Sequence, residues 1–254
     1  MPAPLILAHR GASAAAPENT LVAYELAIEQ GADGLEIDVH PTRDGHLVSI
    51  HDDSVDRTTD GRGRVTELTL AEIRQLDAGS GFSPDFRAVP VPTLDEVLDL
   101  TARHGLVLNI EVKDIYRHDA AYDGAAEAAA EAVLARGLAE QVVFSSFNHT
   151  SMAELKSRHP ELTTGLLMMM PLHEVGAYAR TTGADALHPA LAALTPALIT
   201  QAREANLAVN AWTIAPPFSP LPEEEQLRAM WAAGVDAVIT NIPDVAVAQR
   251  AELA

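Results

Sequence analysis

Three apolar stretches of the sequence end in side chains that suit metal binding, proton transfer or anion binding. These side chains are His9 and Arg10 in "LILAHRG", Glu36 and Asp38 in "LEIDVH", and Glu111 and Lys113 in "LNIEVK". Histidine exchanges protons near neutral pH, and carboxylates bind hard divalent cations. Arginine and lysine bind phosphate or carboxylate groups. If the fold brings the three stretches together, they predict an anion site beside a group of acids.

The spacing of the acids limits how they are neutralised. Side chains two residues apart on a strand share a face, so Glu36 lies beside Asp38, and Glu111 beside Lys113. Buried carboxylates repel one another and are costly to desolvate unless they are paired. A hard cation such as Mg²⁺ or Ca²⁺, held by the three carboxylates, removes that cost. The alternative is a salt-bridge cluster in which Arg10 and Lys113 neutralise the acids.

Short apolar runs alternate with helical patterns along the chain, which is typical of parallel βαβ units. The predicted strands are Leu5–Ala8, Leu35–Val39, Val107–Val112, Val142–Ser146, Thr164–Met169, Ala186–His188, Leu207–Trp212 and Ala237–Thr240. Helical patterns between them include Leu21–Gln30, Ala125–Arg136, Met152–Lys156, Ala197–Ala205 and Glu223–Ala233. Eight such alternations in 254 residues have the size and rhythm of a (β/α)8 TIM barrel, an α/β fold. In that fold the carboxyl ends of the strands carry the active site.

Two features interrupt this rhythm. Asp44-Gly45 predicts a hairpin after the second strand, so that Leu47–His51 runs back antiparallel to it. This places His51 level with the two acids of that strand, although the pattern leaves its face open. A segment over about residues 54–92, rich in Gly, Asp, Arg and Thr, is then expected to form a small inserted subdomain of a single barrel domain spanning 1–254. Capping boxes are predicted at Thr69/Glu72 and Thr93/Glu96.

The composition excludes several classes of function. Hydrophobic residues make up 48% of the chain and charged residues 21%, as in an ordinary globular protein. The formal net charge of −19 disfavours nucleic acid as a partner and stable membrane association. The absence of cysteine excludes disulfides and thiolate chemistry. With no visible signal segment and no membrane span, a cytoplasmic location is expected.

The ordered motifs of the chain resemble those of glycerophosphodiester phosphodiesterases, of the bacterial, soluble type. They are "HRGAS…PENT", "LEIDVH", "IHDDSVDRTTDGRG", "PTLDEVL", "NIEVK", "SSF" and "ITNIPD", and they extend from residue 6 to about 244. The resemblance implies a TIM barrel with an insertion after the second strand. It also implies hydrolysis of glycerophosphodiesters, such as glycerophosphocholine or glycerophosphoethanolamine, to an alcohol and sn-glycerol 3-phosphate. The nucleophile is either the glycerol 2-hydroxyl or water.

The resemblance also implies roles for single residues. It implies that Glu36, Asp38 and Glu111 bind a divalent metal ion and that His9 and His51 are the acid/base pair. It also implies that Arg10 and Lys113 hold phosphate oxygens, and that Phe147 and Trp212 lie near the glycerol and leaving-alcohol pocket. We further expect Gly11 to leave room for the phosphate, and Glu18 and Asn19 to brace the end of the first strand. His149 and His188 are not expected to be catalytic.

Two segments and two alternative functions complete the predictions. "LLMMM", residues 166–170, is expected to be a buried strand, and "WTIAPPFSPLPEEEQ" is a longer, proline-rich loop than many relatives have at the catalytic face. The first alternative function is a phospholipase D-like enzyme acting on lysophospholipids or sphingomyelin, which needs an apolar groove or a membrane-docking surface. The second is a non-catalytic binding protein on the same barrel. The expected partner is a small-molecule substrate, and the chain is expected to be a monomer or a homodimer.

Overall fold

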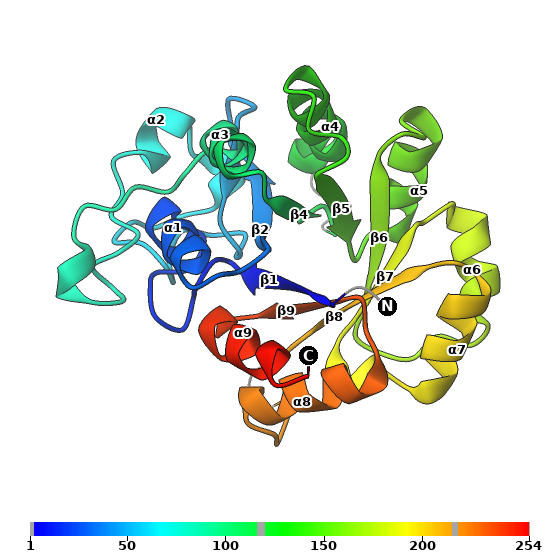
Figure 1. The fold of residues 1–254 in the computed structure, drawn as a ribbon. Coiled ribbons are helices and arrows are strands. Elements are labelled where there is room, and N and C mark those ends of the chain that lie inside the picture. Colours follow the sequence, from blue (N-terminus) through cyan, green and yellow to red (C-terminus); the bar gives the residue numbers. More distant parts are fainter. Residues whose placement is uncertain (1–2, 116–119, 215–217, 254) are drawn as a thin grey trace.

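Eight parallel strands close into a barrel in the computed structural model, which describes residues 3–115, 120–214 and 218–253. The strands are β1 (Leu5–His9), β2 (Gly34–Pro41), β4 (Val107–Val112), β5 (Val142–Ser146), β6 (Thr163–Met168), β7 (Ala186–Pro189), β8 (Ala208–Trp212) and β9 (Ala237–Thr240). β1 pairs with both β2 and β9, which closes the sheet (Figure 1). The predicted (β/α)8 TIM barrel is confirmed.

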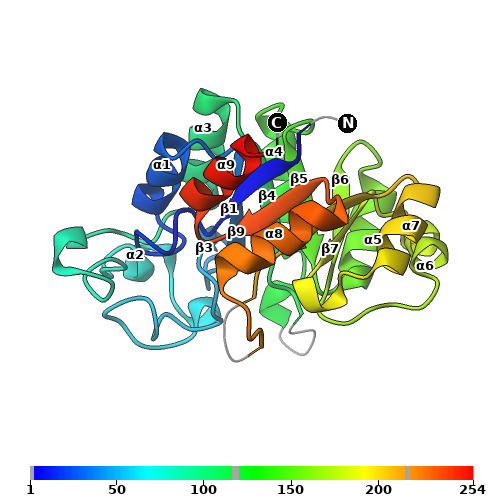
Figure 2. The ribbon, with the colours of Figure 1, turned by 60° about the horizontal axis from the view of Figure 1, so that its bottom comes forward.

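Helices surround the barrel, as Figure 1 and Figure 2 show. They are α1 (Leu21–Glu29), α2 (Leu70–Ile73), α3 (Leu94–His104), α4 (Ala125–Ala135), α5 (His149–Arg158), α6 (Val175–Thr182), α7 (Pro196–Glu204), α8 (Glu223–Ala233) and α9 (Pro243–Ala251). Single 3-10 turns occur at Val65–Glu67, Pro84–Phe86, Ala120–Tyr122 and Leu191–Ala193. No helix in the described ranges is long and apolar enough to span a membrane.

Local sequence explains where several helices begin. The predicted capping boxes are present at α2 and α3, where each threonine hydroxyl accepts from the backbone N–H of the glutamate and each glutamate accepts from that of the threonine. The side chain of Thr20 caps the start of α1 in the same way, by accepting a hydrogen bond from the backbone N–H of Ala23. Because α1 starts where the β1 loop ends, this cap helps to fix the loop that carries Glu18 and Asn19.

The hairpin has the predicted direction but a shorter second arm. β3 (Leu47–Ser49) pairs antiparallel with β2, with Val39 opposite Ser49. It ends two residues before the predicted His51, and the backbone N–H of Ile50 makes one further bond to the carbonyl of Asp38, at 3.2 Å. The same register, continued, leads His51 back towards Ile37. His51 thus leaves the sheet beside the middle of β2, level with Glu36 and Asp38.

The segment over residues 54–92 lies outside the barrel, beyond β2 and β3 and on the side away from α6 and α7 (Figures 1 and 2). Its buried apolar residues pack with the hairpin in a cluster of their own: Val48, Ile50, Val55, Val65, Ile73, Ala78 and Val91. We propose that this segment is an inserted subdomain, held to the barrel through β3. It also carries Arg57, which forms ion pairs with Asp52 and with Glu18.

The prediction for "LLMMM" was only partly right. Leu166, Leu167 and Met168 are buried, but Met169 and Met170 are 37% and 72% exposed. β6 ends at Met168, so the last two methionines lie beyond the barrel wall, where no neighbouring strand covers them. Residues 215–217 of the proline-rich loop lie outside the described residues.

Candidate active site

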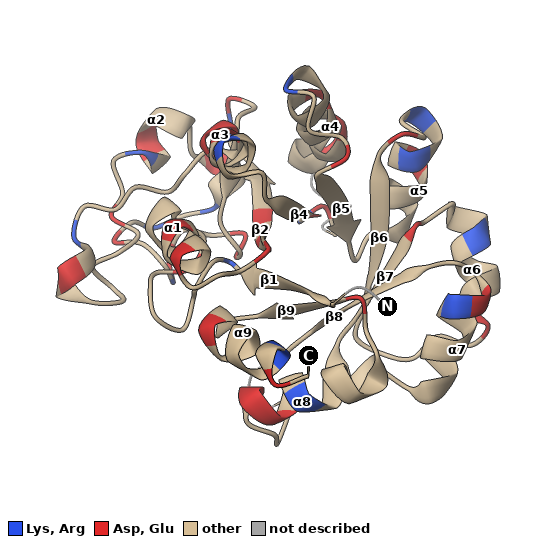
Figure 3. Ribbon diagram, viewed as in Figure 1, with Lys and Arg blue, Asp and Glu red and all other residues tan. Residues whose placement is uncertain are grey.

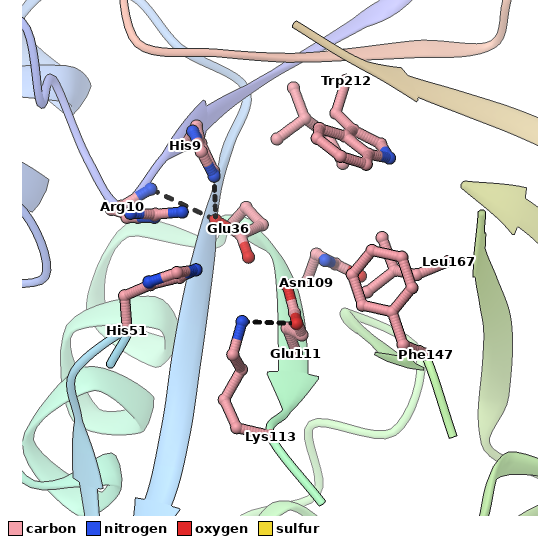
Figure 4. A pocket seen from close by; sticks show the side chains of 11 residues that line it. His9, Arg10, Glu36, His51, Asn109, Glu111, Lys113, Phe147, Leu167 and Trp212 are labelled. Atoms are coloured by element: carbon pink, nitrogen blue, oxygen red, sulfur yellow. Dashed lines mark hydrogen bonds and ion pairs between the residues drawn. The ribbon is translucent and has the colours of Figure 1, made fainter. Parts of the chain in front are cut away.

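Eight of the nine predicted site residues line one pocket of about 430 Å³ at the carboxyl ends of the strands. The lining consists of His9, Arg10, Glu36, His51, Asn109, Glu111, Lys113, Phe147, Leu167, Trp212 and Ile239. The ninth, Asp38, is fully buried against these residues. Figure 4 shows His9, Arg10 and His51 on one side, Phe147 and Trp212 on the other, and Glu36, Glu111 and Lys113 between them. The fold therefore brings together all the residues that the sequence predicted.

The three acids come from neighbouring strands and converge. Glu36 and Asp38 lie on β2, and Glu111 lies opposite Asp38 on the paired strand β4. One carboxylate oxygen from each lies within 4.8 Å of the other two, and all three residues are buried. β2 also stands out among the barrel strands in Figure 3 for its acidic positions, whereas β8 and β9 have no charged residue.

Two basic side chains neutralise only part of this charge. Lys113 Nζ lies 2.7 Å from Glu111 Oε1 and 3.2 Å from Asp38 Oδ1, and Arg10 Nε lies 3.2 Å from Asp38 Oδ2. Both cations therefore contact Asp38, while among the described residues the polar contacts of the Glu36 carboxylate are the backbone N–H of Arg10 at 3.2 Å and His9 Nε2 at 3.9 Å. Three carboxylates against two cations leave one excess negative charge.

The pKa shifts follow this distribution. Burial alone would raise the pKa of Asp38, but the charges of Lys113 and Arg10 outweigh it and hold the pKa well below its usual value. Burial and the charges of Asp38 and Glu111 raise the pKa of Glu36 well above its usual value. The pKa of Glu111 is also raised, by burial and then by Asp38, against the effect of Lys113.

These residues fit a hard divalent cation. Carboxylate oxygens are the ligands that Mg²⁺ and Ca²⁺ prefer, and here three of them lie close enough together to share one ion. Oδ1 of Asp38 is buried, and in the described part of the chain its contact is the ion pair with Lys113 at 3.2 Å, which lacks hydrogen-bond geometry. A cation there would also balance the excess charge beside Glu36.

The ring of His9 is hydrogen-bonded to a residue that follows a barrel strand. Its Nδ1 lies 2.8 Å from Oδ1 of Asn241, which follows β9, and its Nε2 is directed towards Glu36 and the pocket (Figure 4). Burial and the neighbouring Arg10 charge lower the pKa of His9 to about 4. Ser13 Oγ also lies 2.9 Å from Oδ1 of Asn241. The ring therefore has one tethered nitrogen and one nitrogen that faces the site.

The ring of His51 is hydrogen-bonded to the next residue of the chain. Its Nδ1 lies 2.7 Å from Oδ1 of the next residue, Asp52, which is paired with Arg57 at 2.7 Å. The backbone carbonyl of His51 is 3.0 Å from Nε2 of the buried His40. Nδ1 of His51 is thus hydrogen-bonded to a carboxylate, whereas Nδ1 of His9 is hydrogen-bonded to an amide.

The "PENT" loop braces Arg10 as predicted. Glu18 accepts from Arg10 at 3.0 Å and from Arg57 at 2.7 Å and 2.8 Å. Asn19 donates to Asp38 Oδ2 at 2.8 Å. Arg10 itself has the left-handed φ of 58°, which turns the chain sharply at the end of β1.

The predicted reason for Gly11 was wrong. A Cβ at Gly11 would lie 2.6 Å from the backbone carbonyl carbon of Ala23, so the space that Gly11 leaves open is taken by α1. Gly11 also has a φ of 84°, which side chains disfavour. Its role is to let the β1 loop pack against α1.

The opposite wall of the pocket is aromatic. Phe147 and Trp212 pack edge to face with ring centroids 6.3 Å apart, and Trp212 Nε1 donates to the carbonyl of His188 at 3.0 Å. Beyond them the pocket opens into a groove of about 1360 Å³ that Met169, Ile214 and Phe218 also line. Phe218 is 71% exposed.

His149 and His188, which were not expected to be catalytic, have structural contacts. His188 is fully buried inside the barrel, next to Asn210 at 3.0 Å. His149 bridges the carbonyl of Leu167 at 2.8 Å and the hydroxyl of Tyr178 at 2.9 Å.

Sequence reasoning missed the residues that orient the histidines. Asn241 follows the last strand, so the same rule that located His9 could have found it. Asp52 is adjacent to His51 in the sequence. Glu223, whose carboxylate accepts from Asn241, lies near the end of the predicted proline-rich loop, where α8 begins, and no sequence signal marks it.

Comparisons with known proteins give matches over nearly the whole chain. The model of the Glycerophosphoryl diester phosphodiesterase family matches residues 9–245. A glycerophosphodiester phosphodiesterase of Caldanaerobacter subterraneus subsp. tengcongensis is 40% identical over 94% of this chain and 95% of its own length. A crystal structure of the enzyme from Agrobacterium tumefaciens, 30% identical, superposes with a TM-score of 0.82 over 96% of this chain and 99% of its own.

A phosphodiesterase of Oleispira antarctica, solved with its product sn-glycerol-3-phosphate, is 29% identical and superposes with a TM-score of 0.81 over 96% of both chains. The model match and the identity over nearly the whole chain are decisive. This chain belongs to the glycerophosphoryl diester phosphodiesterase family and is an enzyme that hydrolyses glycerophosphodiesters.

Proposed function

We propose that the enzyme hydrolyses small glycerophosphodiesters, such as glycerophosphocholine and glycerophosphoethanolamine, to sn-glycerol 3-phosphate and an alcohol. The observation that carries this proposal is the meeting of His9 and His51 with three acids and two cations in one pocket. The product bound to the Oleispira antarctica relative supports the same choice of product. The expected partner is thus a small molecule.

The residues divide the work by charge. Arg10 and Lys113 are the cations of the pocket, and we assign them to the phosphate oxygens, where negative charge grows as the phosphorus is attacked. Glu36, Asp38 and Glu111 would hold one Mg²⁺ or Ca²⁺ ion. Bound there, a divalent cation adds positive charge at the phosphate oxygens.

Proton transfer falls to the two histidines. Each has Nδ1 tethered to a neighbour, so Nε2 is the atom available to the substrate. One histidine takes the proton from the attacking hydroxyl, and the other gives a proton to the alcohol oxygen as its bond to phosphorus breaks. The attacking hydroxyl is either the glycerol 2-hydroxyl, which gives a cyclic phosphate that water opens, or water itself.

The aromatic wall suits the leaving alcohol. Phe147 and Trp212 face the histidines across the pocket (Figure 4). A cationic headgroup such as choline gains from contact with aromatic faces. We therefore assign these two residues to the leaving-alcohol side.

A second candidate function is favoured by the groove beyond this wall. The lysophospholipid alternative requires an apolar surface, and Met169, Ile214 and Phe218 provide one next to the pocket. In that case the enzyme would release choline from lysophosphatidylcholine and leave lysophosphatidic acid. The same protein preparation can be tested with both substrates.

The test is an assay of the purified protein with glycerophosphocholine and with lysophosphatidylcholine, measuring sn-glycerol 3-phosphate, lysophosphatidic acid and choline. We expect sn-glycerol 3-phosphate to form, to stop with EDTA and to return with Mg²⁺ or Ca²⁺. Turnover only of lysophosphatidylcholine would favour the second function. Full activity in buffer shown to be metal-free by elemental analysis would overturn the metal assignment.

A further inference from the structure

Glu223 lies behind Asn241, on the side away from His9. It is the first residue of α8 and is half-buried between the ends of β8 and β9. Its Oε1 accepts from Thr213 Oγ1 at 2.6 Å, Thr240 Oγ1 at 2.7 Å and the backbone N–H of Asn241 at 2.8 Å. The side-chain amide of Asn241 donates to Oε2 at 3.0 Å. Every one of these partners donates to the carboxylate.

This arrangement determines which way the amide of Asn241 faces. An ionised carboxylate only accepts hydrogen bonds, so the NH₂ group of Asn241 must point to Glu223. The other end of the amide, Oδ1, then faces His9 Nδ1 at 2.8 Å and Ser13 Oγ at 2.9 Å. An amide oxygen also only accepts, so His9 must carry a proton on Nδ1.

We propose that Glu223 is a positioning residue that sets the tautomer of His9 through Asn241. With the proton fixed on Nδ1, the lone pair of a neutral His9 lies on Nε2, the nitrogen directed towards Glu36 and the pocket. The opposite tautomer would place the Nδ1 lone pair against the Oδ1 lone pairs of Asn241. The relay of Glu223, Asn241 and His9 thereby keeps the reactive nitrogen in the form that accepts a proton.

The charge of Glu223 is suited to this role. Burial would raise its pKa, but the hydrogen bonds from Thr213, Thr240 and Asn241 outweigh burial and hold the pKa below its usual value. In the described part of the chain no basic side chain forms an ion pair with Glu223 within 4.0 Å. Its hydrogen-bond donors are therefore neutral groups: Thr213 after β8, Thr240 at the end of β9, and Asn241.

The test compares Glu223→Gln with Glu224→Gln. The amide that Glu223→Gln introduces both donates and accepts, so Asn241 is no longer forced to present its oxygen to His9. Glu224 is exposed in the same first turn of α8, so its variant removes the same charge at the start of the helix. Three quantities are measured: kcat and KM for glycerophosphocholine, the melting temperature, and the ¹⁵N NMR signals of the histidine rings.

We expect Glu223→Gln to lower kcat about 10- to 100-fold with KM changed less than about 3-fold, as for loss of a group that orients a reactive histidine. The His9 signals, identified by their absence in His9→Ala, should change from a neutral ring protonated on Nδ1 to a mixture of tautomers. Glu224→Gln should match the wild type. A loss of kcat with the Nδ1-protonated form intact would overturn the proposal, as would an unchanged kcat.

Glu223→Asp is the second variant and covers the case in which Glu223→Gln does not fold. A shorter carboxylate still only accepts, so we expect it to keep the Nδ1-protonated form of His9. A mixture of tautomers in Glu223→Asp would contradict the inference. The inference rests on the proposed role of His9, but the NMR measurement does not depend on the substrate. If the wild type were inactive on glycerophosphocholine, the proposed function would be wrong. The tautomer of His9 in the two Glu223 variants would still decide the role of Glu223.

Discussion

The two histidines of the pocket are supported by different parts of the molecule. His9 lies at the end of β1 and is tethered by Asn241, which directly follows the last strand β9, and through it by Glu223 at the start of α8. His51 lies just beyond the hairpin strand β3 and is tethered by Asp52, which pairs with Arg57 of the inserted segment. The partner of the first ring is a neutral amide, and that of the second is a carboxylate.

This difference indicates how each ring depends on the fold. The support of His9 consists of barrel elements, and it forms only when β9 closes against β1. The support of His51 is mostly local, because Asp52 is its neighbour and Arg57 follows five residues later. Arg57 nevertheless connects the surroundings of the two histidines, since it also binds Glu18, and Glu18 binds Arg10, the residue next to His9.

The largest effect expected is from removing either ring. His9→Ala and His51→Ala should each lower kcat by about 10²–10⁴, the range for loss of a general acid or base. Both side chains lie at the barrel mouth, so both variants should fold with near-normal circular dichroism. Near-normal kcat in one of them would show that this histidine does not transfer a proton.

Replacing the carboxylate behind His51 should cost less. Asp52→Asn gives His51 the kind of partner that His9 has and removes the acceptor-only group, so we expect kcat to fall about 10- to 100-fold. Asp53→Asn is the matched control, because Asp53 is the next residue and its carboxylate lies 3.8 Å from Arg64 rather than near the pocket. Equal activities of the two variants would show that the carboxylate behind His51 has no special role.

Arg10 separates binding from stability. Arg10→Lys keeps the charge but loses the planar pair of donors that fits phosphate oxygens, so kcat/KM should fall about 10-fold or more. The melting temperature should change little. If Arg10 served only to neutralise Asp38 and Glu18, the variant would instead melt earlier and keep normal kinetics.

The smallest effect concerns stability at low pH. Burial would raise the pKa of Asp52, but hydrogen bonds from Arg57 and His51 outweigh it and lower the pKa to about 2. A carboxyl group whose pKa is lowered by folding stabilises the protein above its unfolded pKa, near 4, and this contribution disappears as the pH falls towards about 2. The melting temperature of the wild type should therefore exceed that of Asp52→Asn above about pH 5, and the gap should narrow below about pH 4. A gap of constant size across this range would contradict the assignment.

The sequence predicted the strands and most of the site because those signals are local. The runs "LEIDVH" and "LNIEVK" show both a buried strand and the faces of its acids, since side chains alternate along a strand. The turn at Asp44-Gly45 similarly predicted the return of His51. Where exposure depended on neighbouring strands, as at Met169 and Met170, or on a helix from elsewhere, as at Gly11, the local pattern misled.

The sequence by itself therefore determined the barrel, its family and the residues that face the pocket. Only the tertiary structure decided which partner each ring and charge has. Asn241 is 232 positions from His9 and meets it because closure of the barrel places β9 beside β1. Glu223 reaches Asn241 from the start of α8, and Lys113 lies between Asp38 and Glu111 because β2 and β4 are paired. A hydrogen bond needs atoms within about 3 Å in a defined orientation, and for residues far apart in the chain only the packed fold sets that geometry.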